Sequence, residues 1–327
     1  TKLYQPKTIT SKEIQDNGTY KVYGANGVIG YFEEYNHEEN EVVITCRGAT
    51  CGTINMTEAK SWITGNAMVS HPIDNTKLLK IYLFEMLKYI DLSIVITGTA
   101  QPQITRENIS PIKIPLPPLE IQEEIVKECQ KVDDEVLKAN ETIEQSKANI
   151  ILAMNSSEAN TPMKLGDACD MKAGKFVSAK DIFDENDGSM YPCFGGNGQR
   201  GFTKTFTHDG VYPLIGRQGA LCGNITLAQG KFHATEHAVA VTPLVEMDIK
   251  WLYHKLILLN LNQYATGTAQ PGLSVNNIKT VSISMPPLET QKQIVSKIEK
   301  LETLIAEAKK VIEGSKEQKE TILREYL

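Results

Sequence analysis

The sequence predicts a mixed α+β protein with two duplicated globular domains, separated by an antiparallel pair of long coiled-coil helices around a pseudo-twofold axis. Three observations support this prediction. Long motifs recur once at a nearly constant offset, each copy combines short alternating strands with one helix, and each copy closes with a heptad pattern of apolar residues.

The repeat is clearest in its second half. The hexapeptide TGTAQP occupies 97–102 and again 266–271, and PPLEIQEEIV (117–126) matches PPLETQKQIV (286–295), both at an offset of 169 residues. Upstream, the offsets become 170 to 171. There YGANG matches FGGNG, and RGATCG, which contains Arg47, matches RQGALCG, which contains Arg217. Solenoid repeats have periods of roughly 20–50 residues, so this spacing indicates duplicated domains.

Both copies predict the same order of elements. A Gly-rich start is followed by strands such as EVVITC and HAVAVT, by a helix, by the TGTAQP loop, by a short strand and by a long helix after Pro-Pro. We expect the shorter helices at 77–90 and 249–262, and the short strands at 112–116 (IKIPL) and 281–285 (VSISM). The expected domains are 1–115, the spacer helix 116–158, 159–285 and the second spacer helix 286–327.

The two long helices carry identical apolar steps of four and three residues, which form an a/d seam over about three heptads. Such a narrow stripe needs a partner, and the other long helix is the obvious one; the alternative is that each helix packs back on its own domain. At about 1.5 Å per residue the helices would form a rod roughly 50 Å long. The seam residues are Ile125, Cys129, Val132, Val136, Ala139 and Ile143 in the first helix, and Ile294, Ile298, Leu301, Ile305, Ala308 and Ile312 in the second.

Charge distribution, hydropathy and cysteine spacing limit the classes of protein to which this chain can belong. The net charge of −6 lies entirely within residues 116–162, and the rest of the chain is neutral overall. No apolar run reaches the ~18 residues of a membrane span, and no signal peptide is recognisable at the start, so we expect a cytoplasmic protein. None of the six cysteines forms a CxxC pair, which suits reduced thiols.

The counterpart of Met163–Cys169 would precede Thr1, so the first domain looks clipped and the chain could be the C-terminal part of a longer polypeptide.

Motifs for catalysis are weak or missing. GNGQRG (196–201) fits GxGxxG, but strands and turns follow it instead of a helix, so a tight turn is the better interpretation than a dinucleotide site. HATEH (233–237) lacks the HExxH pattern of a zinc protease, and we interpret it as polar residues near a strand start. The sequence contains no P-loop, no GxSxG elbow, no amino-methylation motif and no nuclease core. We therefore expect the chain to bind without catalysing a reaction or holding a cofactor or metal.

Polar loops in equivalent places of the two copies are the candidate binding surface. Arg suits the acceptors on guanine edges, and Asn or Gln suits adenine edges, so these loops indicate contact with duplex DNA. TGTAQP is identical in both copies, so we interpret it as shared architecture, either a helix-exit loop that packs under the following strand or a common phosphate or partner contact. Divergent stretches would carry any difference in specificity, such as VIGYFEE against QRGFTKT, or Arg47-Gly48 against Arg217-Gln218. The candidate DNA-binding residues are Asn26, Val28, Tyr31, Arg47, Gln101, Asn197, Gln199, Arg200, Lys204, Arg217, Gln218 and Gln270.

PPLExQxxIV between a strand and a heptad helix, present twice with GTxQP upstream, resembles the specificity subunit of type I restriction-modification enzymes. The resemblance implies two target recognition domains that each read one half of a split DNA sequence. It also implies spacer helices that dock two modification subunits, which bind S-adenosylmethionine and methylate adenine at N6; restriction subunits can join them. The specificity subunit itself performs no chemistry.

Two other interpretations remain open at this point. The chain could be the recognition portion of a single-chain enzyme that fuses nuclease, methyltransferase and specificity parts. It could also be a scaffold or adaptor with a coiled-coil spacer that does not bind DNA.

Overall fold

A computed structural model describes residues 1–24, 27–156, 161–219, 221–267 and 271–326. The chain divides into two compact units. Unit 1 consists of Thr1–Asn140 with Lys309–Leu327, and unit 2 consists of Glu141–Ala308. Each of the two long helices therefore contributes one segment to each unit.

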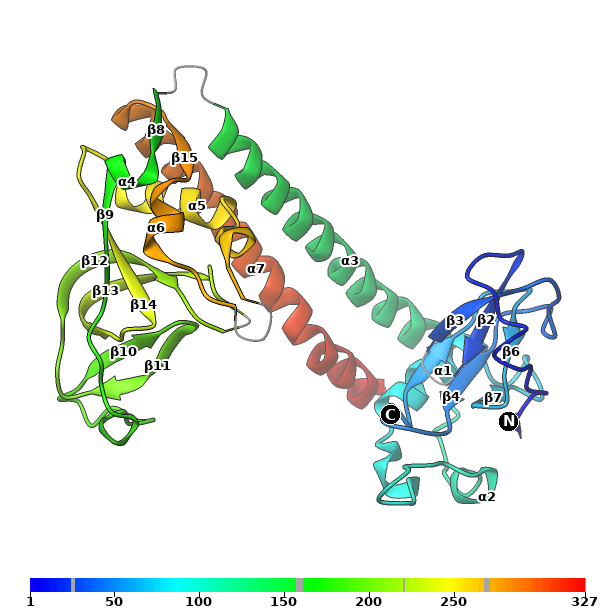
Figure 1. Cartoon of the computed structure of the whole chain (residues 1–327). Helices are drawn as coiled ribbons and strands as arrows, with labels where there is room; N and C mark the ends of the chain where they lie inside the picture. Colours follow the sequence, from blue (N-terminus) through cyan, green and yellow to red (C-terminus); the bar gives the residue numbers. More distant parts are fainter. Residues whose placement is uncertain (25–26, 157–160, 220, 268–270, 327) are drawn as a thin grey trace. The chain divides into compact units, whose positions relative to one another are not determined.

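Within its described residues, unit 1 contains two small sheets, one ten-residue helix and a segment of each long helix (Figure 1). The first sheet is antiparallel, in the order β1 (Lys2–Tyr4), β7 (Ala67–His71), β4 (Val42–Thr45) and β5 (Ile54–Met56). The second has the order β3 (Gly27–Phe32), β2 (Tyr20–Gly24) and β6 (Trp62–Ile63), with β2 and β6 parallel. The helical elements are α1 (Lys80–Tyr89), η1 (Leu92–Val95), α2 (Arg106–Ile109) and the long helix α3 (Leu119–Asn155).

Unit 2 repeats this plan with a larger sheet. Its six strands have the order β11 (Gly198–Thr203), β10 (Tyr191–Gly195), β13 (Ile225–Ala234), β12 (His208–Gly216), β14 (Ala238–Pro243) and β9 (Cys169–Ala173). A separate ladder joins β8 (Thr161–Lys164) to β15 (Ser282–Met285). The helical elements are α4 (Leu165–Ala168), η2 (Ala179–Asp181), α5 (Ile249–Leu258), η3 (Leu261–Tyr264), α6 (Val275–Lys279) and the long helix α7 (Leu288–Tyr326).

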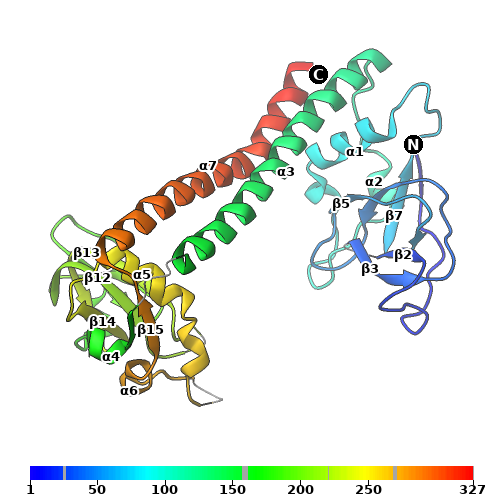
Figure 2. The same ribbon diagram turned by 90° about the horizontal axis from the view of Figure 1, so that it is seen from above.

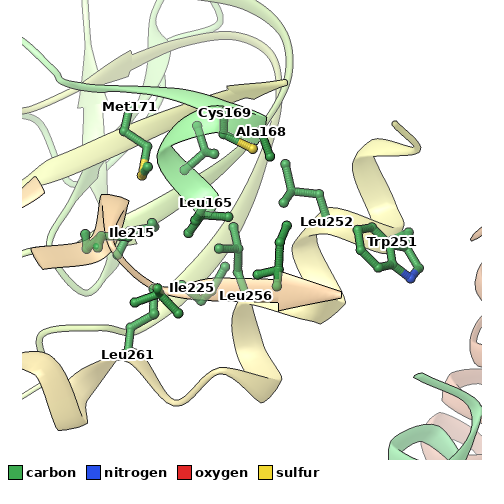
Figure 3. Close-up of a cluster of buried hydrophobic side chains, with 14 of the residues drawn as sticks. Leu165, Ala168, Cys169, Met171, Ile215, Ile225, Trp251, Leu252, Leu256 and Leu261 are labelled. Atoms are coloured by element: carbon green, nitrogen blue, oxygen red, sulfur yellow. The ribbon is translucent and has the colours of Figure 1, made fainter. Parts of the chain in front are cut away.

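The core of unit 2 forms where α5 faces the sheet (Figure 3). Trp251, Leu252 and Leu256 are fully buried on one side of α5, at the helical spacing that the sequence predicts. They meet side chains from α4, β12 and the start of α7, including the buried Ile298. Since apolar burial is the main stabilising contribution in a domain of this size, this cluster holds the sheet and the long helix together.

The seam of the long helices is buried as predicted, but its partner differs along its length. Ile125 and Cys129 share the core of unit 1 with α1 and with Leu323 from the end of α7. Ile294 and Ile298 share the core of unit 2 with α5 and with Met154 and Ala153 from the end of α3. The first turns of each helix therefore pack on their own globular unit as well as on the other helix. The start of one helix meets the end of the other, so the two run in opposite directions (Figures 1 and 2).

The remaining seam residues follow the same pattern. Val132 and Ala139 are buried in unit 1, where Val136 and Ile312 are half-buried. Ile143 and Ala308 are buried in unit 2, where Leu301 and Ile305 are half-buried.

One buried glutamine ties the start of each long helix to the globular fold. The Nε2 of Gln122 donates to the carbonyl of Lys77 at 2.8 Å, and its Oε1 accepts the N–H of Leu79 at 2.9 Å. The Oε1 of Gln291, at the same position of the second copy, accepts the N–H of Asp248 at 2.8 Å. An unpaired buried backbone group costs free energy, so a glutamine is required here in both copies, and this requirement explains the recurrent PPLExQ motif.

Most of the expected elements are confirmed. EVVITC contains β4, HAVAVT covers all but the last residue of β14, and the two shorter helices form as α1 and α5. The strand expected at IKIPL (112–116) is wrong, because no strand forms at those residues. The equivalent strand β15 pairs with β8, whose counterpart at the repeat offset would precede Thr1. Among the described residues, no strand pairs with 112–116.

All six cysteines are free, as expected for reduced thiols. Burial raises the pKa of Cys46 and Cys129 to about 11 and that of Cys169 to about 12, which keeps these thiols protonated and unreactive at neutral pH. Within the described ranges, no helix combines the length and apolar character that crossing a bilayer requires.

Candidate nucleic-acid interface

A glycine-rich hairpin recurs in both units. β2 and β3 meet at Gly24 and Gly27, and β10 and β11 meet at Gly195 and Gly198. Gly27 and Gly198 have φ of 87° and 88°, a conformation that favours glycine. A strand follows GNGQRG and no helix does, so its interpretation as a tight turn is confirmed.

A second pair of glycines lets another segment approach each hairpin. Gly30 and Gly201 have φ of 149° and 147°. A Cβ on Gly201 would lie 2.4 Å from the carbonyl oxygen of Phe183, and one on Gly30 would lie 2.7 Å from that of Gln15. The glycines of both hairpins are therefore architectural.

The TGTAQP loops are closed by the same backbone pair in both units. The N–H of Thr97 donates to the carbonyl of Gln103 at 2.9 Å, and the reverse bond measures 2.8 Å. Thr266 and Gly272 form the same two bonds at 2.8 and 2.9 Å. Gly98 has φ of 86°, so the conserved geometry explains the glycine at this position of the loop.

Each TGTAQP loop also anchors the loop that contains RGATCG or RQGALCG. The N–H of Gly48 donates to the carbonyl of Pro102 at 3.0 Å, and the N–H of Gly219 donates to that of Pro271 at 3.0 Å. The same backbone bond therefore positions the neighbouring loop in both units, which agrees with the interpretation of TGTAQP as shared architecture.

These contacts correct the expected alignment of the arginines. Gly48 and Gly219 have φ of 89° and 87° and the same partners, so they occupy equivalent positions. Arg47 precedes Gly48, and Gln218 precedes Gly219. Arg47 pairs with Gln103 in a β-bridge, as Gln218 pairs with Gly272. Arg47 is therefore equivalent to Gln218 and not to Arg217, because the structural offset in this loop is 171.

Arg217 instead corresponds to a buried cysteine. The N–H of Arg217 donates to the carbonyl of His237 at 3.0 Å, and the N–H of Cys46 donates to that of Asn66 at 3.1 Å. Cys46 is fully buried, whereas Arg217 is half-buried. The two units thus differ in size, charge and hydrogen-bonding capacity at this position.

Unit 2 gathers three of the predicted residues around one cavity of about 500 Å³. Arg200 extends across the bare face of Gly195, where an added Cβ would lie 2.4 Å from its Cδ. Only a glycine at that position lets the arginine side chain lie over the strand. The lining residues are Gly196, Asn197, Arg200, Gln218, Gly219, His237, Pro271 and Gly272.

His237 lines this cavity, and sequence reasoning missed it as a binding residue. The sequence pattern of HATEH was compared only with that of a zinc site. The structure separates its two histidines, since His233 is buried and contacts Thr205 Oγ1 and the carbonyl of Lys175, at 3.0 Å each. Within the described residues, no three His, Cys, Asp or Glu side chains gather as a metal site would require. The sequence does contain a glycine-rich turn at 196–198, but only the three-dimensional structure shows that His237 lies at the same cavity as this turn.

The other candidates lie outside this cavity. Gln199 is exposed on β11, and Lys204 is exposed directly after the end of that strand, where its Nζ lies 5.8 Å from the ring centroid of Phe183. In unit 1, Val28, Arg47 and Gln101 are exposed, and Tyr31 is half-buried. Asn26 and Gln270 lie outside the described residues.

Gly216, at the end of β12, controls the shape of the cavity. A Cβ on Gly216 would lie 1.8 Å from the carbonyl oxygen of Gly196, which lines the cavity. We expect Gly216→Ala to destabilise unit 2 by about 1–3 kcal/mol, as overpacking does. Urea unfolding measures this change.

Gly314→Ala is the matched control for this prediction. An added Cβ there meets no atom within 4 Å, and the residue lies inside α7. We expect no loss of stability from this change, because alanine favours the helix over glycine by about 1 kcal/mol. Equal behaviour of the two variants would contradict the role assigned to Gly216.

The sequence matches the family described as "Type I restriction modification DNA specificity domain" over residues 2–146 and 158–314. It is 44% identical over 156 residues to the type I restriction enzyme EcoprrI specificity subunit of Escherichia coli, an alignment that covers 47% of this chain and 39% of that protein. It is 23% identical to the type I restriction enzyme MjaVIII specificity subunit of Methanocaldococcus jannaschii, covering 98% of this chain and 87% of that protein.

Solved structures support the fold. The S subunit of a type I restriction-modification system from M. genitalium matches with a TM-score of 0.66 at 15% identity, covering 100% of this chain and 93% of that one. A chain from a structural study of type I R-M system assembly matches with a TM-score of 0.56 at 16% identity, covering 99% and 97%. The duplicated hairpins, the anchored loops and the two-part family match agree, and the chain belongs to the family of type I restriction-modification DNA specificity domains.

Proposed function

We propose that this chain is a specificity subunit that binds double-stranded DNA at a bipartite site. Residues 1–115 and 159–285 act as the two target recognition domains, and residues 116–158 and 286–327 act as spacer helices. The observation that carries the proposal is the recurrence of one backbone scaffold with different side chains on it. Val28 of the first hairpin corresponds to Gln199 of the second, since both follow a positive-φ glycine.

Arginine and amide side chains give unit 2 a means of reading bases. Guanine presents two acceptors to an arginine in the major groove, and adenine presents a donor and an acceptor to an amide. Arg200, Asn197 and Gln218 supply these groups around one cavity. Because the equivalent hairpin of unit 1 carries valine and isoleucine, the two units would select different half-sites.

The partners in this proposal are two modification subunits, joined in some assemblies by restriction subunits. The modification subunits bind S-adenosylmethionine and methylate adenine, while this chain selects the sequence without catalysing a reaction. The acidic segment 116–162 favours a protein partner over DNA along α3. We place this assembly in the cytoplasm of a prokaryote.

The test is to sequence methylated adenines in a host that carries this chain and its modification subunit. We expect one bipartite motif with a fixed gap, which is absent when the chain is omitted. Binding of the assembled complex to duplexes of that motif should weaken steeply with salt, because phosphate contacts release counterions. A scaffold that does not bind DNA would leave no motif and no salt-sensitive binding.

A further inference from the structure

Two nitrogens at one end of the unit 2 sheet are buried without a hydrogen-bond partner among the described residues. They are Nε of Arg217 and Nδ1 of His237. The two residues are adjacent, because the N–H of Arg217 donates to the carbonyl of His237 at 3.0 Å. Buried polar groups in native proteins are nearly always paired, so a group left unpaired calls for a ligand or another explanation.

The fold itself does not require these side chains. The equivalent residues of unit 1 are Cys46 and Asn66, which share the same backbone bond. The Sγ of Cys46 is satisfied locally by the carbonyl of Ile44 at 3.4 Å. A neutral residue therefore serves this backbone equally well, and the arginine of unit 2 has a different purpose.

The surroundings suit a ligand that accepts hydrogen bonds. His237 and Gln218 line the cavity of about 500 Å³, and Arg217 lies directly before Gln218 in the chain. Arg200 and Asn197 line the same cavity. An arginine Nε–H donates in every protonation state, so its partner must offer an oxygen or nitrogen lone pair. The acidic neighbour is Glu236, whose Oε1 lies 3.2 Å from Nε2 of His237 and not on Nδ1.

We propose that Arg217, with His237 beside it, forms a contact site in unit 2 in which the arginine donates to an acceptor-bearing group of the target duplex, and that unit 1 lacks this site. This inference rests on the proposed function and deepens it. Two groups of duplex DNA share the required chemistry, the N7 and O6 edge of guanine and the oxygens of a phosphate. In either case the contact belongs to only one of the two half-sites.

The test installs the residues of unit 1 in unit 2. Arg217→Cys and His237→Asn are made in the full chain, assembled with its modification subunits, and Arg217→Lys is made beside them. Each complex is tested against a pool of random duplexes and by sequencing methylated adenines in the host. We expect Arg217→Cys to weaken binding about 5- to 150-fold, the range of a single lost specific contact.

The outcomes separate the two sources of the acceptor. A guanine contact predicts that the methylated motif relaxes at one position of one half-site and that Arg217→Lys rescues little, because lysine lacks the bidentate fork. A phosphate contact predicts an unchanged motif, a salt slope reduced by about one, and substantial rescue by Arg217→Lys. His237→Asn should shift the same property as Arg217→Cys.

Arg106→Cys, the same change at an exposed position of unit 1, is the control for loss of charge. Circular dichroism confirms that the variants fold. If the wild-type complex methylates a bipartite motif and Arg217→Cys changes neither motif, affinity nor salt slope, this inference is overturned while the proposed function stands. If the wild-type complex shows no motif and no binding, the proposed function falls and this inference falls with it.

Discussion

Replacing Lys319 with methionine is expected to destabilise unit 1 by about 3–5 kcal/mol, the typical cost of removing one member of a buried ion pair. Lys319 Nζ, on α7, lies 2.7 Å from Oδ2 of Asp133 on α3 and 3.1 Å from Oε2 of Glu85 on α1. The side chains of Lys319 and Glu85 are only 13% and 6% exposed. Methionine would fill the space but leave the carboxylate of Glu85 buried without its cation.

Urea unfolding followed by tryptophan fluorescence measures this loss, since Trp62 reports on unit 1 and Trp251 on unit 2. Lys316→Met is the matched control. The Lys316 side chain is 84% exposed, and its Nζ lies 3.9 Å from Oε1 of Glu320, so we expect a change within about 0.5 kcal/mol. The double variant Glu85→Leu with Lys319→Met should recover most of the loss. A loss of equal size in the control and in Lys319→Met would contradict the buried ion pair.

The charge of Lys319 also makes the stability of unit 1 depend on pH. Burial alone would lower the pKa of Lys319, but the hydrogen bond to Asp133 and the charge of Glu85 favour the cation and leave the pKa above its usual value. A raised pKa means that the stabilisation is complete below the unfolded-state pKa of about 10.4 and is lost only as pH rises through the folded-state pKa. Neutral conditions therefore keep this contact fully charged.

Replacing Trp251 with alanine is expected to destabilise unit 2 by about 3–5 kcal/mol. The indole is fully buried in the cluster of Figure 3, where α5 meets the start of α7. Its removal leaves a large cavity between the helix and the neighbouring side chains, and the surroundings relax only in part. Hydrogen exchange of the α5 amides measures the loss locally.

Trp251→Phe separates packing from hydrogen bonding. The indole Nε1 is buried and has no partner among the described residues, whereas the hydroxyl of the equivalent Tyr82 donates to the carbonyl of Pro115 at 3.0 Å. Phenylalanine removes the unpaired donor and keeps most of the apolar volume, so we expect a smaller loss than for alanine. An equal loss would show that the indole nitrogen has a partner that stabilises the fold.

The two repeats differ in how the end of a long helix contacts the globular unit. Lys319 near the end of α7 corresponds to Ile150 near the end of α3, and Glu85 corresponds to His254. Ile150 packs against the apolar core of unit 2. Burial lowers the pKa of His254, which favours its neutral form. The end of α7 therefore contacts unit 1 through an ion pair as well as apolar side chains, whereas at the equivalent position the end of α3 contacts unit 2 through an apolar side chain.

The sequence by itself determined the duplication, the two shorter helices and the two long helices, and the order in which they follow one another. Repetition revealed the two copies, because duplicated domains keep the residues their shared backbone needs, such as the glycines of the hairpins and the glutamines Gln122 and Gln291. Periodicity revealed which residues of the long helices are buried, because burial follows the 3.6-residue turn within one element. The strand-forming and turn residues that follow GNGQRG likewise indicated that no helix begins there, and none does.

Only the tertiary structure decided which residues meet. Register between strands made Arg47 equivalent to Gln218, and it placed Arg217 beside His237, although sequence alignment had matched the two arginines. Likewise, β15 forms as a strand because it pairs with β8, a segment about 120 residues earlier in the chain, whereas the similar stretch at 112–116 pairs with no strand among the described residues. The physical reason is the same in each case. A residue's own sequence neighbourhood sets its local conformation, whereas its partners are set by hydrogen bonds and packing between segments whose spacing a single insertion can shift.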